Sequence, residues 1–327
     1  MTAPLKVAVV GTGSWGEQHA RIFAGRRDTA LVAVVGRNAE RTQRRAEAYG
    51  AKGYVSIDEM LDAEKPDLVT TCLPNEGHYE PTLQLIQRGI PLLVEKPLVF
   101  ELTEGAHLIE EAARQDLFFA INFNHRYAEA VQRAYAAIRR GDLGEIVHAS
   151  WRFGGEANHG DSAFCNLFET QCHGFDMLEH LVGPISSVMA QMTDKADPGS
   201  YNTMAVALEF QNRAVGSLLG TYDSSYAYPD SQYIEINGTA GRLLIQDTVR
   251  KLTISKTGDE SRQVWEPGYF NDSAREFKHT FDKHVDEILT AFRAGHEPPI
   301  HARAGQRAVR LGAACVQSFR EGTRILV

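Results

Sequence analysis

The feature that most constrains the fold is a glycine pattern near the N-terminus. An apolar run at residues 6–10 ends in Gly11-Thr12-Gly13-Ser14-Trp15-Gly16, which opens an expected helix at residues 14–25. In such a GxGxxG turn the first glycine permits a tight bend, the second lets the backbone approach a pyrophosphate, and the third packs helix on strand. The first N–H groups of the helix also favour phosphate. The setting predicts that these six residues bind a dinucleotide, whereas the structural alternative is a glycine-rich turn without a ligand.

The first 122 residues alternate apolar runs with helix-like stretches. Further apolar runs at residues 30–35, 67–73, 91–94 and 118–122 are separated by expected helices at residues 39–49, 79–88 and 103–115. Continuous apolar strands between amphipathic helices are typical of a parallel sheet that helices cover on both faces. The pattern predicts an N-terminal Rossmann domain, a doubly wound α/β fold, over residues 1–122.

After Asn122 the pattern changes. Helices are expected near residues 129–140, 169–181, 274–294 and 304–320, and alternating polar and apolar strands at residues 146–153, 203–210, 214–222, 232–237 and 242–246. Such alternation is typical of an antiparallel sheet with one less buried face. Residues 123–327 are therefore predicted to form a second α/β domain. Apolar residues on the second face of its sheet need a partner or water.

Composition excludes several classes of protein. The net charge of −8 argues against general nucleic-acid binding. No segment approaches the roughly 20 consecutive apolar residues of a membrane helix, and residues 1–5 lack the basic start of a signal peptide. The cysteines Cys72, Cys165, Cys172 and Cys315 form neither a CxxC pair nor a zinc-ligand spacing. We expect a cytoplasmic protein with free thiols, no membrane association and no metal site.

The turn after the second strand faces the ribose 2′ position of a bound dinucleotide. NAD enzymes usually carry Asp or Glu at that strand end, where it binds the ribose hydroxyls. Here the sequence runs Val35-Gly36-Arg37-Asn38. No carboxylate repels a 2′-phosphate, and the Arg37 guanidinium is suited to pair with one. The turn therefore favours NADP as the cofactor, with NAD as the alternative; in the structural alternative Arg37 is simply a solvated helix start.

A lysine follows the fourth apolar run, in Glu95-Lys96-Pro97. Ligands of doubly wound sheets sit beyond the carboxyl ends of the strands, which is where Lys96 is expected. A lysine beside the positive nicotinamide ring should have a depressed pKa and could hydrogen-bond the reacting oxygen. Pro97 fixes the turn and is a candidate for a cis peptide bond. The structural alternative is a surface Glu–Lys pair at a strand end.

Several motifs occur together in a specific order. They are the GxGxxG turn, Pro74-Asn75 with His78, Glu95-Lys96-Pro97, the segment 122–127 with Arg126, His173 with Asp176, and the hairpin with Glu235, Gly238 and Gly241. In this order they resemble the Gfo/Idh/MocA oxidoreductases, the glucose–fructose oxidoreductase and inositol dehydrogenase group, over essentially the whole chain. The resemblance implies a large, mostly antiparallel open sheet in the second domain. It also implies that this sheet packs against another subunit, in a homodimer or homotetramer.

The resemblance also implies site residues. It implies cofactor contacts for Pro74, Asn75, His78, Glu95 and Lys96, and substrate contacts for Lys96, Arg126, Asn158, His159, Asn166, Glu169 and His173. His173 takes the place of the family's catalytic histidine, while Glu169 stands where the family commonly has aspartate. These two residues are i,i+4 neighbours on an expected helix, so Glu169 orients the histidine, binds a substrate hydroxyl, or does neither.

The expected activity is oxidation of a secondary alcohol of a sugar or polyol, or reduction of the matching ketone. His173 would take the hydroxyl proton, Lys96 would polarise the oxygen, and hydride would pass to the nicotinamide. One alternative is an NAD-dependent glycoside hydrolase that acts by transient oxidation. The other is a non-catalytic dinucleotide-binding sensor, which would need neither Lys96 nor His173.

Overall fold

The computed structural model describes residues 3–74, 77–156 and 162–327, so Asn75, Asn158 and His159 lie outside the described residues. The chain forms two compact units. Unit 1 comprises Met1–Asn122 and His284–Gln306, and unit 2 comprises Phe123–Lys283 and Arg307–Val327. The return of His284–Gln306 to unit 1 differs from the single second domain expected for residues 123–327.

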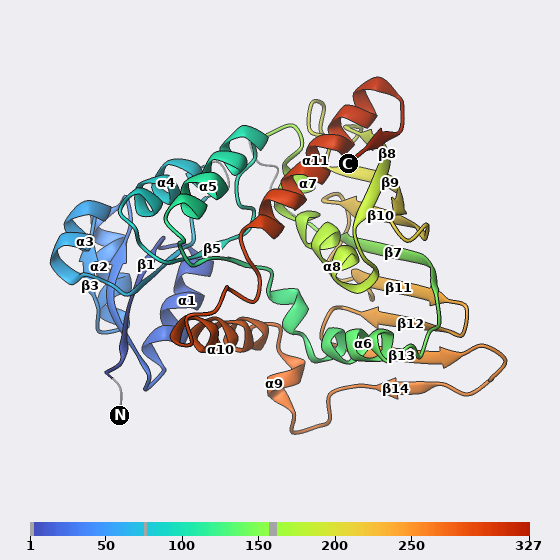
Figure 1. Ribbon diagram of the computed structural model, residues 1–327, viewed down its shortest axis with the longest axis horizontal. Coiled ribbons are helices and arrows are strands. Elements are labelled where there is room, and N and C mark those ends of the chain that lie inside the picture. Colours follow the sequence, from blue (N-terminus) through green and yellow to red (C-terminus); the bar gives the residue numbers. More distant parts are fainter. Residues whose placement is uncertain (1–2, 75–76, 157–161) are drawn as a thin grey trace. The chain divides into compact units, whose positions relative to one another are not determined.

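Unit 1 is built on a parallel sheet with strand order β3-β2-β1-β4-β5-β6 (Figure 1). Its strands are β1 (Leu5–Val10), β2 (Thr29–Val35), β3 (Lys52–Tyr54), β4 (Leu68–Thr71), β5 (Leu92–Glu95) and β6 (Phe119–Asn122). Its helices include α1 (Ser14–Ala24), α2 (Ala39–Ala48), α3 (Ile57–Glu64), α4 (Tyr79–Gln87) and α5 (Leu102–Arg114). The central strands are buried along their length, as continuous apolar runs require. This topology confirms the doubly wound fold.

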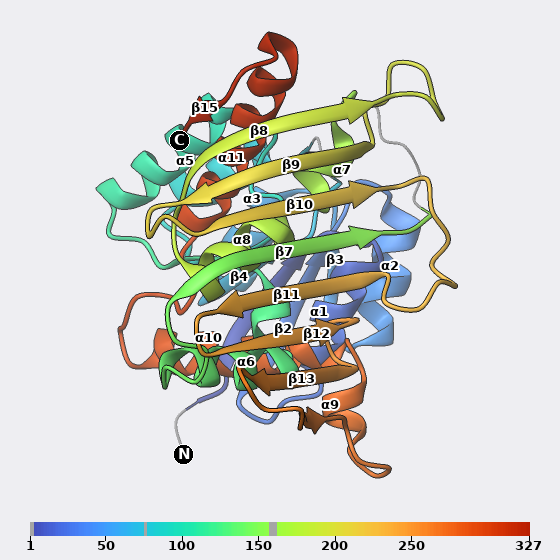
Figure 2. The same cartoon turned by 90° about the vertical axis from the view of Figure 1, so that its right-hand side faces the viewer.

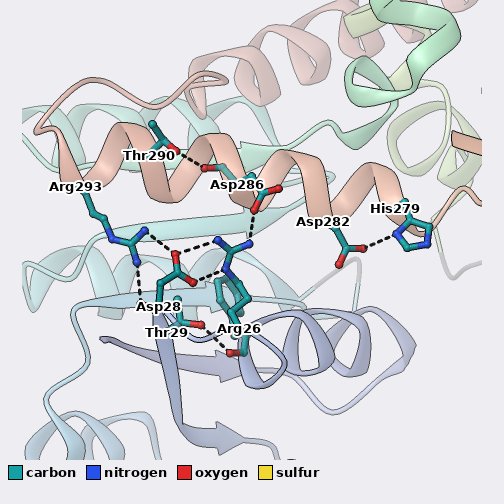
Figure 3. Close-up of polar contacts among 9 residues, drawn as sticks. Arg26, Asp28, Thr29, His279, Asp282, Asp286, Thr290 and Arg293 are labelled. Atoms are coloured by element: carbon teal, nitrogen blue, oxygen red, sulfur yellow. Dashed lines mark hydrogen bonds and ion pairs between the residues drawn. The ribbon is translucent and has the colours of Figure 1, made fainter. Parts of the chain in front are cut away.

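The returning segment is held to unit 1 by backbone and charged contacts. The Ile121 N–H donates to the Ile300 carbonyl at 3.1 Å, so this segment covers the edge strand β6. In helix α10 (His279–Arg293), Arg293 donates to the Asp28 carboxylate at 2.8 Å, and Arg26 donates to the same carboxylate at 2.9 Å (Figure 3). These guanidinium contacts lower the pKa of Asp28 to about 2, the Arg26 hydrogen bond being the largest cause. A local sequence pattern cannot predict the pairing of Arg293 with Asp28, because the two residues lie far apart in the chain.

Unit 2 is built on a mostly antiparallel sheet with strand order β14-β13-β12-β11-β7-β10-β9-β8-β15 (Figure 2). Only β7 and β10 pair in parallel among its described strands. The strands are β7 (Ile146–Gly154), β8 (Ile185–Thr193), β9 (Thr203–Phe210), β10 (Val215–Thr221), β11 (Gln232–Gly238), β12 (Gly241–Gln246), β13 (Lys251–Lys256), β14 (Gln263–Trp265) and β15 (Ile325–Leu326). The expected large open sheet is confirmed.

Helices lie against one face of this sheet, with α6 and α8 behind the strands in the view of Figure 2. The helical elements are η2 (Asn124–Tyr127), α6 (Glu129–Arg139), α7 (Cys165–Glu169), α8 (Cys172–Val182), α9 (Asp272–Arg275) and α11 (Arg303–Glu321), whose last part belongs to unit 2. The core between helices and sheet contains Trp151, Phe175 and Phe210. Among the described residues, no helix combines the length and apolar character that crossing a membrane requires.

Candidate active site

Each glycine of the GxGxxG turn has a distinct structural role. Gly11 has φ +129°, and a Cβ there would lie 2.1 Å from the Cys72 carbonyl oxygen. A Cβ at Gly16 would lie 2.2 Å from the Gly11 carbonyl oxygen, so α1 can approach β1 only without a side chain. Gly13, by contrast, has no heavy atom within 4 Å of a Cβ position and makes no side-chain cap for α1. Open space beside the helix N-terminus fits the approach of a pyrophosphate.

The turn after β2 contains no carboxylate. A Cβ at Gly36 would lie 2.6 Å from both Thr12 Cγ2 and Thr42 Oγ1, which leaves no room for an acidic side chain. Asn38 caps α2 by accepting a hydrogen bond from the Arg41 backbone N–H at 2.9 Å. Arg37 is exposed, and its guanidinium forms no ion pair within the described residues. An uncommitted guanidinium at this place is suited to a phosphate.

The loop after β4 contains Pro74 and His78, which the family resemblance assigns to the cofactor. The His78 side chain is buried, and its Nε2 donates to the Leu73 carbonyl oxygen at 2.8 Å. This bond fixes the loop where it leaves β4, just before α4 begins at Tyr79. The structure therefore gives His78 a supporting position under the loop.

Lys96 follows directly on the carboxyl end of β5, and the Lys96–Pro97 peptide bond is cis. Strands β1, β4 and β5 are parallel neighbours, so Lys96 and the glycine turn occupy the same edge of the sheet. The preceding Glu95 is only 3% exposed. Its Oε1 accepts from His19 Nε2 at 2.8 Å and from Asn122 Nδ2 at 2.6 Å. Glu95 is thus a buried support for Lys96.

His173, on α8 of unit 2, is packed among aromatic rings. Its ring stacks on His125 with centroids 4.0 Å apart and planes 23° apart. Phe123 meets His173 edge-on at 5.7 Å, and Phe277 meets His125 edge-on at 5.1 Å. These ring contacts hold the His173 imidazole in one orientation within unit 2. An imidazole is a side chain suited to act as a general base.

Glu169 lies at a helix break that the sequence did not predict. Helix α7 ends at Glu169 and α8 begins at Cys172, so the expected single helix over residues 169–181 is interrupted. Glu169 Oε2 accepts from the Tyr222 hydroxyl at 3.2 Å and from Cys165 Sγ at 3.4 Å. Burial, and then the charge of Glu169, raise the pKa of Tyr222, so the phenol stays a donor. The i,i+4 argument for pairing Glu169 with His173 assumed a continuous helix and no longer applies.

Arg126 and Asn166, which are also expected to contact the substrate, form hydrogen bonds within unit 2. Arg126 binds the buried carboxylate of Asp176 in a two-pronged ion pair, with Nε to Oδ2 at 2.8 Å and Nη2 to Oδ1 at 2.5 Å. Asn166 is fully buried, and its amide bonds Asn202 at 2.6 Å and Gln171 at 3.0 Å. These hydrogen bonds fix the Asn166 side chain within unit 2.

Sequence reasoning missed His19, His125 and Tyr222. His19 could have been noticed, because it follows Gly16 by three residues and so lies on the same face of α1. His125 directly precedes Arg126, but nothing local predicts its stacking on a residue far along the chain. Tyr222 directly follows β10, and no sequence motif marks it.

The fold of unit 1 and its glycine turn are those of a dinucleotide-binding domain. Residues 5–123 match the family model described as an oxidoreductase family, NAD-binding Rossmann fold. Residues 136–327 match the model of the same family's C-terminal alpha/beta domain. The chain belongs to the Gfo/Idh/MocA oxidoreductase family, as its motifs indicated.

Curated relatives include two dehydrogenases. The chain is 35% identical over 147 residues to D-glucoside 3-dehydrogenase of Escherichia coli, a match that covers 44% of this chain and 42% of that protein. It is 25% identical over 341 residues to myo-inositol 2-dehydrogenase of Thermotoga maritima, which covers 97% of both chains.

Solved structures share the fold over the full length. Levoglucosan dehydrogenase in complex with NADH and levoglucosan superimposes with a TM-score of 0.88 at 18% identity, covering 99% of both chains. The WlbA dehydrogenase of Bordetella pertussis, in complex with NADH and UDP-GlcNAcA, has a TM-score of 0.86 at 21% identity and covers 100% of this chain and 99% of that one. At these identities the likeness establishes the fold alone.

Proposed function

We propose that this oxidoreductase transfers hydride between a nicotinamide dinucleotide and a secondary alcohol or ketone of a sugar or polyol. The observation that carries the proposal is the shared edge of the unit 1 sheet, where the glycine turn follows β1 and Lys96 follows β5. The dehydrogenase relatives named for a glucoside and an inositol support the substrate class.

The bound dinucleotide supplies the hydride acceptor or donor. Gly13 and the first turn of α1 would hold its pyrophosphate. The loop with Pro74 follows the neighbouring strand β4. During oxidation Lys96 donates a hydrogen bond to the substrate oxygen and stabilises its developing negative charge. His173 takes the proton from that hydroxyl, while the carbinol C–H bond breaks as hydride leaves and the C–O bond becomes C=O. Reduction reverses each step.

We propose NADP as the preferred dinucleotide and NAD as the weaker ligand. Support comes from the crowding at Gly36, which leaves no place for a strand-end carboxylate, and from the exposed guanidinium of Arg37. A 2′-phosphate carries charge that this turn attracts rather than repels.

A substrate panel tests the activity. Sugars, glycosides and polyols are screened with NADP and with NAD, with formation of the reduced nicotinamide followed by absorbance and products by chromatography. Turnover that forms the reduced dinucleotide in proportion to ketone supports the proposal. Cleavage of glycosides without net reduction would instead identify a hydrolase that oxidises transiently. Dinucleotide binding with no turnover of any substrate would identify a sensor.

We also propose that the exposed face of the unit 2 sheet binds a second copy of the chain. Met189, Val215 and Leu219 are 45%, 54% and 43% exposed on strands β8 and β10. Helices lie against the other face, and exposed apolar patches on a sheet usually mark an interface. A homodimer or homotetramer follows if each copy covers this face of another. The four free, buried cysteines support a reducing, cytoplasmic location.

A further inference from the structure

A chain of buried polar side chains underlies the edge of the unit 1 sheet where Lys96 lies. It consists of Thr70, His19, Glu95, Asn122 and His284, each 3% exposed or less, and we call it the His19 network. Thr70 Oγ1 lies 3.2 Å from His19 Nδ1, and His19 Nε2 lies 2.8 Å from Glu95 Oε1. These contacts connect α1, whose N-terminus carries the glycine turn, with β5, the strand that Lys96 directly follows.

The donors and acceptors of the His19 network fix the Glu95 carboxylate. The Asn122 side-chain amide N–H donates to Glu95 Oε1 at 2.6 Å. The amide oxygen of Asn122 therefore faces His284 and accepts a hydrogen bond from His284 Nδ1 at 2.7 Å. Reversing the Asn122 amide would place donor against donor at His284 and acceptor against acceptor at Glu95. The other carboxylate oxygen of Glu95, Oε2, is left for the backbone N–H of Lys96 at 3.3 Å. The network therefore determines where the Lys96 backbone begins its turn.

The central contact of the network is an ion pair. Burial disfavours both charges, but the interactions with Cys72 and Glu95 raise the pKa of His19 to about 10. Burial, the largest single effect, also raises the pKa of Glu95. The hydrogen bond and charge of His19 nevertheless hold the pKa of this carboxyl below its usual value. A charged hydrogen bond in a dry interior is stronger and better oriented than a neutral one.

The same groups do not have the geometry of a metal chelate. Ligand atoms of His19, Cys72 and Glu95 all lie within 4.8 Å of one another. Two ligand atoms each about 2.0–2.1 Å from a tetrahedral zinc are separated by about 3.3 Å. His19 Nε2 and Glu95 Oε1 are 2.8 Å apart, which is a hydrogen-bond distance. His19 and Glu95 therefore form an ion pair, and the Cys72 thiol lies beside it.

We propose that His19 and Glu95 form a positioning pair, which fixes the backbone at Lys96 so that its ammonium group meets the substrate oxygen. This inference rests on the proposed function and adds residues that touch neither substrate nor cofactor. Small errors in the placement of a catalytic group reduce turnover on the order of 10²-fold. Loss of the pair should therefore lower kcat more than it weakens dinucleotide binding.

The test compares His19→Leu, which removes the donor, with His19→Gln, which keeps a neutral donor. The matched control is Thr29→Val. Thr29 is also buried in unit 1, and its hydroxyl donates to the Phe23 carbonyl oxygen. It lies at the amino end of β2, whereas Lys96 follows the carboxyl end of β5. Each variant is assayed for Tm, dinucleotide Kd, kcat, KM and the primary deuterium isotope effect with carbinol-deuterated substrate. An unfolded fraction lowers apparent kcat without changing the isotope effect, whereas a misplaced Lys96 slows hydride transfer and raises that effect.

We expect His19→Leu to lower kcat on the order of 10²-fold and to raise the isotope effect, with Kd within about threefold of wild type. His19→Gln should recover part of the rate, and Thr29→Val should lower Tm alone. Wild-type kcat and isotope effect in a folded His19→Leu protein would overturn the proposal. If that variant does not fold, the same result for His19→Gln would overturn it.

A second readout needs no turnover. Lysines are methylated with 13C, and the Lys96 signal is assigned as the one that Lys96→Met lacks. His19→Leu should shift or broaden this signal, and Thr29→Val should leave it in place; an unchanged signal in His19→Leu counts against the positioning pair. If wild-type protein turns over no substrate, the proposed function fails, while the Lys96 signal still reports on the pair.

Discussion

At the residue scale, the proposed chemistry rests on two side chains that lie in very different surroundings. Lys96 is partly buried at a strand end, with its carboxylate neighbour Glu95 turned inward to His19 and Asn122. His173 lies against another imidazole and an aromatic ring. An ammonium group is suited to stabilise an alkoxide, and an imidazole is suited to accept a proton. The roles that we propose for the two residues in alcohol oxidation are therefore complementary.

Lys96→Met should abolish most turnover and leave the protein able to bind the dinucleotide. Methionine has a similar length but carries no charge and no donor, so loss of a positioned proton-transfer group should lower kcat by about 10²–10⁴-fold. Steady-state kinetics and fluorescence titration with NADPH measure the two quantities. Lys256→Met, at an exposed position on β13, serves as the control. A kcat like that of wild type would remove Lys96 from the mechanism.

His173→Ala should remove the acidic limb of the pH profile for oxidation. In wild type kcat/KM should fall at low pH as the imidazole protonates and can no longer accept the hydroxyl proton. His180→Ala, on the same helix, is the matched control, because burial and then Arg126 lower the pKa of His180 to about 4. Its profile should keep the limb of wild type. An unaltered profile in His173→Ala would refute the base assignment.

Arg37→Asp should reverse the cofactor preference. Wild type should bind NADPH more tightly than NADH, and the variant should lose roughly 10–100-fold in NADPH affinity, the value of one charge-assisted hydrogen bond. Arg44→Asp makes the same charge change on α2, where Arg44 is exposed and 3.9 Å from Glu40. Titrations of both dinucleotides decide the matter. Tighter NADH binding by wild type would contradict our interpretation of the turn.

Residue positions were predictable from sequence where they depend on local structure. The close approaches at Gly11 and Gly16 and the place of Lys96 at a strand end could be predicted because a bend, a close approach and a strand end are properties of a few adjacent residues. The His125–His173 stack could not, since it joins η2 to α8 through tertiary packing. The burial of Asn166 against Asn202 could not be predicted for the same reason, because it depends on the packing of the chain around it.

At the element scale, short elements and chain returns escaped prediction. Strand β3 has three residues and α3 eight, too few for a periodic pattern to emerge. The break between α7 and α8 was missed because Glu169 to Cys172 contains no proline or glycine. The return of His284–Gln306 to unit 1 depends on α10 reaching Asp28, as Figure 3 shows.

Asp28→Asn should loosen the attachment of α10 to β2. Because the Asp28 side chain is 39% exposed, solvent screens its ion pairs and the expected loss at pH 7 is only about 0.5–1 kcal/mol. The folded-state pKa lies below the unfolded value, so this stabilisation is present above about pH 4 and disappears as pH falls through about 2. Urea unfolding at pH 7 and pH 3 should show a smaller difference between the proteins at pH 3. An equal difference at both values would exclude the carboxylate as its source.

At the scale of the whole molecule, the two kinds of sequence pattern correspond to two kinds of sheet. Continuous apolar runs became the parallel sheet of unit 1, and alternating runs became the mostly antiparallel sheet of unit 2. Strand β9 shows the alternation directly, with Met204, Val206 and Leu208 buried and the residues between them exposed. Strand order within the sheet was not predictable, because β7 pairs with β10 and β11 rather than with its sequence neighbour.

Leu219→Glu should convert an oligomer into monomers. Leu219 is 43% exposed on β10 and pairs with Ala205 of β9 on one side and with Arg152 of β7 on the other. If a second copy covers this face, association takes the new carboxylate out of water, a cost that pairing with Arg152 offsets only in part, so the interface is destabilised. The matched control is Val55→Glu, an apolar residue of unit 1 that is 58% exposed. Light scattering at micromolar concentration should give an oligomer for wild type and for Val55→Glu, and the monomer mass of about 36.2 kDa for Leu219→Glu. A monomeric wild type would show that water, and not a second copy, covers this face of the sheet.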